Sequence, residues 1–118
     1  MKMHQSKTGA NPEGYCSDYS KLDGYDARGL DGHGVVEVWY SYRVAPYAGA
    51  GELIAMNTNG DFTLHDMSHC SCYGPTEHFE PAWVDGSKVW ARFPAFRDEF
   101  RHLVEAYGFL RAKLGVPE

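Results

Sequence analysis

The chain has few cysteines and no long apolar run. Its 118 residues contain three cysteines, an odd number that argues against a disulfide framework. No apolar segment follows Met1 that could serve as a signal peptide or cross a membrane. These absences predict a cytoplasmic protein that does not span a membrane.

Basic residues are missing from the middle of the chain. No Lys or Arg lies between Arg43 and Lys88, and the acidic residues of that interval are Glu52, Asp61, Asp66, Glu77, Glu80 and Asp85. With a net charge of −5 and no basic cluster, the chain is not expected to bind nucleic acid. The acidic stretch has two explanations, an internal match with the mildly basic C-terminal segment or the steering of a partner.

The composition favours one folded domain. Hydrophobic residues make up 43% of the chain and aromatic residues 14%, which is enough for a core in a domain of this length. Residues 1–34 are rich in Gly and Tyr and show no helical or strand period, so we expect an irregular arm that its tyrosines lay over the core. Residues 35–118 are expected to form a single α+β domain.

Two apolar patterns predict isolated strands. Residues 35–44 alternate between two faces, with Val36, Val38, Tyr40 and Tyr42 on one side. Residues 88–93 follow an Asp-Gly turn and predict a further short strand.

Asn59-Gly60 predicts a β-hairpin. This dipeptide suits a two-residue type I′ turn, here between strands at 52–58 and 61–67. Such a turn pairs Met56 with Thr63 and Ile54 with His65. Both faces of the hairpin are then partly apolar, so we expect a helix on one face and the N-terminal arm on the other.

Residues 95–114 predict an amphipathic helix with one local flaw, Gly108. Its apolar side chains recur at helical spacing: Phe96, Phe100, Leu103, Tyr107, Leu110 and Leu114. We expect this helix to pack on one face of a small antiparallel sheet of three to five strands, which makes the fold class α+β.

Residues 65–78 concentrate histidine and cysteine, the side chains that bind zinc most often. The candidate zinc ligands are Cys16, His65, His69, Cys70, Cys72 and His78. The C-x-C spacing is shorter than the spacing of most zinc sites. A thiol-dependent enzyme with Cys70 or Cys72 as nucleophile, and a purely structural role for these residues, therefore stay open beside zinc.

The run Ser68-His69-Cys70-Ser71-Cys72-Tyr73-Gly74, followed by acidic and aromatic residues as far as Trp83, resembles a pattern in small uncharacterised proteins encoded by bacteriophages. The resemblance does not reach the N-terminal arm or the C-terminal helix. It carries no known activity. It implies a protein that binds a host or defence component, or an accessory part of the phage particle, located in the host cytoplasm or the virion.

We therefore expect a non-enzymatic protein-binding module that acts through its acidic, aromatic loop. Aromatic side chains contribute strongly to interfaces. The candidate contact residues are Asp66, Tyr73, Glu77, Phe79, Glu80 and Trp83. A zinc-stabilised structural or particle protein is the first alternative, and a thiol-dependent enzyme is the second.

Overall fold

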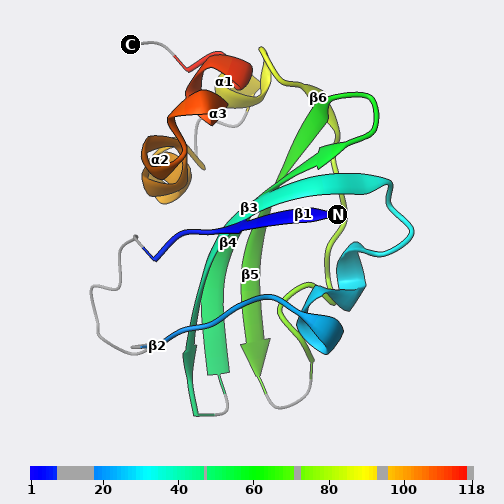
Figure 1. Ribbon diagram of the computed structural model, residues 1–118, viewed down its shortest axis with the longest axis vertical. Helices are drawn as coiled ribbons and strands as arrows, with labels where there is room; N and C mark the ends of the chain where they lie inside the picture. The colour runs from blue at the N-terminus through cyan, green and yellow to red at the C-terminus, as the bar shows by residue number, and fades with distance from the viewer. Residues whose placement is uncertain (8–17, 47, 71–72, 93–95, 117–118) are drawn as a thin grey trace.

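The sheet is built around the long strand β3 (Val35–Ala45). It pairs antiparallel with β4 (Ala48–Asn57), which pairs antiparallel with β5 (Asp61–Cys70). Two residues of β6 (Val84–Asp85) extend the sheet beside the start of β5. The computed structural model, drawn in Figure 1, describes residues 1–7, 18–46, 48–70, 73–92 and 96–116. The predicted strand at 35–44 and the predicted hairpin are both confirmed.

The N-terminal segment supplies two further strands. β1 (Lys2–Gln5) pairs parallel with β3, and β2 (Asp18–Tyr19) pairs antiparallel with it. The α+β class is confirmed, but in the described part of the chain the sheet is mixed and has six strands, whereas the sequence predicts three to five antiparallel ones. β1 and β2 are too short to show a period, and their extended form depends on pairing with β3.

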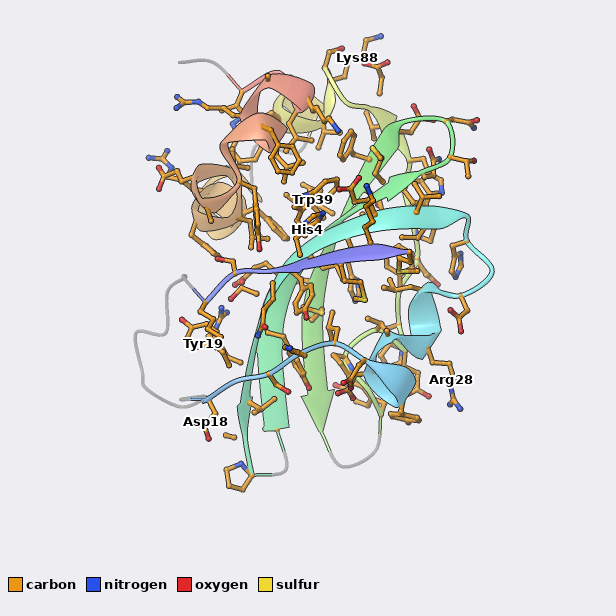
Figure 2. All side chains as sticks on the ribbon, viewed as in Figure 1. His4, Asp18, Tyr19, Arg28, Trp39 and Lys88 are labelled. Carbon is orange, nitrogen blue, oxygen red and sulfur yellow. The ribbon has the colours of Figure 1, made fainter. Side chains whose placement is uncertain are left out.

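His4 fixes β1 against β3. Its ring stacks on Trp39 with 5.4 Å between centroids and an interplanar angle of 11°. Both residues are labelled in Figure 2. Its Nε2 also lies 2.7 Å from a carboxylate oxygen of Glu37. The first residues of the arm are therefore held by a side-chain contact as well as by backbone pairing.

The rest of the arm is anchored by leucines. After β2 the chain forms the 3-10 helix η1 (Gly24–Leu30). Leu22 and Leu30 are buried, whereas Tyr25 is 57% exposed and Tyr19 is half-buried. The hydroxyl of Tyr40 accepts the backbone N–H of Leu22 at 2.9 Å. The arm does cover the sheet, but among its described residues leucine, and not tyrosine, enters the core.

Helices cover one face of the sheet (Figure 1). These are α1 (Val89–Arg92), α2 (Phe96–Ala106) and α3 (Gly108–Lys113). The predicted strand at 88–93 is wrong, because the apolar Val89 and Trp90 are buried from a short helix that packs on the sheet. The predicted helix at 95–114 is interrupted at Tyr107, whose φ of −119° and ψ of 76° are not helical.

A separate core lies on each face of the sheet. The helix-side core combines Trp39 and Ile54 of the sheet with buried helical residues such as Phe100, Leu103 and Leu110. The core on the opposite face combines other sheet residues with the arm and with the connection after β5, and includes Val38, Leu53, Met67, Leu22, Leu30 and Phe79. The expected division between a helix on one face and the arm on the other is therefore observed.

The hairpin register differs by one residue from the prediction. Ala55 pairs with Thr63 and Ile54 with Leu64, because the loop contains three residues, Thr58 to Gly60. A single glycine at φ 80°, Gly60, closes this loop, as in a type I turn followed by a bulge. The shift exchanges the two faces of β5, so that Leu64 lies on the helix side and His65 on the other.

No helix in the described part of the chain is both long and apolar enough to cross a membrane.

Candidate functional site

The segment 73–80, which contains the turn at residues 75–78 and is called the turn below, is fixed against η1. The hydroxyl of Thr76 accepts the backbone N–H of Gly29 at 3.1 Å and donates to the carbonyl of Asp26 at 2.6 Å. A side chain at position 29 would overlap the carbonyl group of Thr76, so glycine permits this close approach. Two segments that are distant in sequence therefore form one surface (Figure 1).

His65 supports the same turn from the sheet. Its Nε2 donates to the carbonyl oxygen of Pro75 at 3.2 Å, and its ring meets the ring of Phe79 edge-on at 5.4 Å. Burial lowers the pKa of His65, although the hydrogen bond to Pro75 opposes this effect. His65 is therefore neutral at neutral pH and acts as a structural donor beneath the turn.

The candidate contact residues divide by exposure. Glu77, Glu80 and Asp66 are exposed, and Tyr73 and Trp83 are half-buried. Phe79 is only 4% exposed and belongs to the core beneath the turn, so it does not present its ring to a partner. The turn therefore offers charged side chains at its surface, while its own phenylalanine anchors it to the sheet.

Asp66 is separated from the other acidic candidates. It pairs across the sheet with Glu52, whose carboxylate lies 3.2 Å from Nε2 of His102 on α2. Asp66 therefore belongs to the helix side, whereas the turn packs on the opposite face. Partial desolvation by neighbouring residues and the charge of Glu52 raise the pKa of Asp66, although its side chain reaches solvent.

The polar cluster around Glu52 is internally paired. Arg43 donates to both carboxylate oxygens of Glu52, at 2.8 and 3.2 Å, and to the hydroxyl of Ser41 at 3.1 Å. Burial raises the pKa of Glu52, but hydrogen bonds from His102 and Arg43 outweigh it and leave the pKa below its usual value. This cluster connects β3, β4 and α2, and we assign it a structural role.

Several candidate zinc ligands lie wholly or partly outside the described part of the chain. Cys16 and Cys72 lie entirely outside it, and only the backbone of His69 and Cys70, at the end of β5, is described. The ring of His78 packs edge-on against Tyr73 at 4.7 Å. Among the side chains that the structure describes, no group of three His, Cys, Asp or Glu residues is placed to hold a metal. Zinc stays a prediction.

Two residues of η1 join the turn and were not anticipated. Tyr25 and Arg28 line a small pocket together with Gly29, Gly74 and Glu77. The guanidinium of Arg28 lies 4.7 Å from the centre of the Tyr25 ring, and Figure 2 shows Arg28 extending away from the sheet. The bond from Gly29 to Thr76 spans 47 sequence positions, and no local pattern relates residues so far apart.

We give the name turn surface to six accessible side chains of η1 and the turn: Tyr25, Arg28, Tyr73, Glu77, His78 and Glu80. It combines an exposed aromatic ring with charges of both signs on a backbone held by tertiary hydrogen bonds. These features are typical of a recognition surface. Comparison of the chain with protein-family models, curated proteins and solved structures finds no match.

Proposed function

We propose that the protein is a binding module that contacts a partner protein through the turn surface. The observation that carries this proposal is the fixed backbone of the turn, which Thr76 ties to η1 and His65 ties to β5. A surface that is ordered before binding loses less conformational entropy when a partner binds. Tyr25, which is 57% exposed, supplies a large apolar contact at its edge.

The charges of the turn favour a partner with basic residues. Glu77 and Glu80 are both exposed, and Asp23 at the start of η1 is exposed as well. Complementary charge accelerates association and makes it sensitive to salt. The resemblance of residues 68–83 to bacteriophage proteins supports a host or defence component as the partner, and binding without catalysis as the mode of action.

Two substitutions test the acidic contact without disturbing the turn. Glu80→Lys reverses a charge that has no hydrogen bond or ion pair within the described residues. Glu77→Gln removes a charge but keeps an oxygen for the backbone N–H of Gly74, which Glu77 accepts at 3.1 Å. The control is Glu105→Lys, the same charge reversal on α2, on the other side of the sheet.

A partner is first captured from a bacterial lysate with the unaltered protein and identified, and its affinity for each variant is then measured by calorimetry. We expect Glu80→Lys to weaken binding about tenfold, mainly through slower association, and Glu77→Gln to weaken it less. Thermal midpoints and the affinity of Glu105→Lys should match those of the unaltered protein. Full affinity of both turn variants would contradict the proposal.

A further inference from the structure

Tertiary hydrogen bonds hold the walls of the pocket between η1 and the turn. One wall is η1, held by the bonds of Thr76 to Gly29 and Asp26, and the other is the turn itself. At Gly74 an added Cβ would lie 3.0 Å from the ring of Tyr25, so this glycine keeps the space beside the ring free of a side chain. The pocket is therefore formed before any ligand arrives.

Among the described residues that line the pocket, one is a cation and one is an anion, and the two do not pair with each other. Within the described residues, the guanidinium of Arg28 contacts the face of Tyr25 and makes no hydrogen bond or ion pair. Glu77 uses one carboxylate oxygen to accept the N–H of Gly74, and the other has no partner among the described residues. Both charges are thus available to a ligand at a shared site.

The presence of both Arg28 and Glu77 selects the charge type of the ligand. A lone anion is attracted by Arg28 but repelled by Glu77. A lone cation is attracted by Glu77 but repelled by Arg28. A group that carries both charges satisfies both side chains, because guanidinium binds carboxylate through parallel N–H donors and Glu77 accepts from an ammonium group.

We infer that the pocket binds a zwitterionic group whose carboxylate and ammonium lie close together in space. This inference rests on the proposed function, since it names the chemistry that the turn surface recognises. In a partner protein the group is an acidic residue beside a lysine. A free amino acid carries the same chemistry.

A matched set of small molecules tests the charge requirement. The ¹⁵N-labelled protein is titrated with 4-aminobutyrate, with butyrate and with butylammonium at low ionic strength, and the amide signals of Gly29, Gly74 and Glu77 are followed by NMR. The three probes have the same carbon chain and differ only in their charged ends. We expect 4-aminobutyrate to bind about fivefold more tightly than either of the other two.

Two variants locate the effect. Arg28→Gln should remove the advantage of 4-aminobutyrate over butylammonium, and Glu77→Gln should remove its advantage over butyrate. Glu77→Gln keeps the acceptor for Gly74, so the wall of the pocket is retained. A peptide with blocked ends, acetyl-Glu-Lys-amide, distinguishes the two sources: tighter binding than 4-aminobutyrate assigns the pocket to a partner protein, and weaker binding assigns it to a free amino acid.

Equal shifts with all three probes, or no shift with any, would overturn the inference. That result leaves the proposed function standing if Glu80→Lys still weakens the partner complex, because Glu80 does not line the pocket. Conversely, full partner affinity of Glu80→Lys and Glu77→Gln together with selective binding of 4-aminobutyrate would retain the pocket and remove the protein-binding role.

Discussion

At the residue scale, the acidic middle of the chain divides between two environments. Glu52 is half-buried and bonded to Arg43 and His102, whereas Glu77 and Glu80 are exposed. The first carboxylate connects sheet and helix, and the other two lie where a partner can reach them. Carboxylates of the same acidic stretch therefore differ in environment: Glu52 contributes to stability, whereas Glu77 and Glu80 are accessible for the proposed recognition.

Glu52 makes stability depend on pH. Its pKa is lower in the folded protein than in the unfolded chain, so its contribution is complete above the unfolded value of about 4.5 and is lost as pH falls through the folded value. We expect Glu52→Gln to cost about 1–3 kcal/mol at pH 7, because Arg43 loses a charged acceptor. The difference from the unaltered protein should shrink below about pH 4.

Urea unfolding from pH 7 to pH 3 measures this effect. Glu105→Gln is the matched control, since Glu105 is exposed on α2 and its loss should change the free energy of unfolding little at any pH. A constant difference between Glu52→Gln and the unaltered protein over the whole range would contradict the linkage.

The zinc hypothesis makes a prediction about Cys70 and Cys72. If these thiolates bind zinc, the purified protein contains one zinc ion per chain by elemental analysis, and chelator lowers its melting temperature. The double substitution Cys70→Ser with Cys72→Ser should then abolish both the metal and the response to chelator. A metal-free protein whose melting is unaffected by chelator would eliminate the site.

At the scale of single elements, Asn57 determines the hairpin turn. Its Oδ1 accepts the backbone N–H groups of Asn59 and Asp61 at 3.0 and 2.9 Å. We expect Asn57→Ala to lower the free energy of unfolding by about 1–2 kcal/mol, because two backbone donors lose their acceptor. Asn57→Asp keeps the acceptor and should cost less. Chemical denaturation of both variants checks this order, and equal losses would contradict it.

Replacing either of two glycines outside the hairpin by alanine should change the free energy of unfolding, in opposite directions. Gly29→Ala places a methyl group against the carbonyl of Thr76, so η1 must move away from the turn, at a cost of about 1–3 kcal/mol. Gly108→Ala meets no atom within 4 Å and should stabilise the start of α3 by up to about 1 kcal/mol. Thermal melts compare the two variants, and a destabilised Gly108→Ala would show that the break at Tyr107 is needed.

At the scale of the whole molecule, a single sheet carries a hydrophobic core on each of its two faces. Leu103 is buried on the helix side and Leu30 on the opposite side. We expect Leu103→Ala and Leu30→Ala each to cost about 2–5 kcal/mol and to unfold the whole domain in one transition. Denaturation followed by near-UV and far-UV circular dichroism checks this, and two separated transitions would show that the cores unfold independently.

The sequence predicts the parts of the fold that have a local pattern. The alternation in β3 and the apolar spacing in α2 are visible in a single segment, because each element buries one face. β1 and β2 lack such a pattern and become strands through a distant partner. The predicted register of β5 is wrong, because Asn59-Gly60 suits both a two-residue and a three-residue loop. The hydrogen bonds accepted by Asn57 favour the longer loop.

In the candidate site, too, only features with a local sequence pattern could be predicted. The exposure of Glu77 and Glu80 agrees with their polar character, but the burial of Phe79 depends on His65 and on the sheet beneath it. Tyr25 and Arg28 reach the turn through contacts that span about half of the chain. Only the tertiary fold relates them to Glu77.

The parallel pairing of β1 has a consequence for the order of assembly. β4 and β5 are joined by a three-residue loop, whereas the contact of His4 in β1 with Glu37 in β3 joins residues 33 positions apart in the sequence. Closing a short loop costs less entropy than closing a long one, so the meander of β3, β4 and β5 should form first and β1 should attach late. A strand that joins late is held only by a segment distant in sequence, so we expect β1 to detach before the meander of β3, β4 and β5 opens.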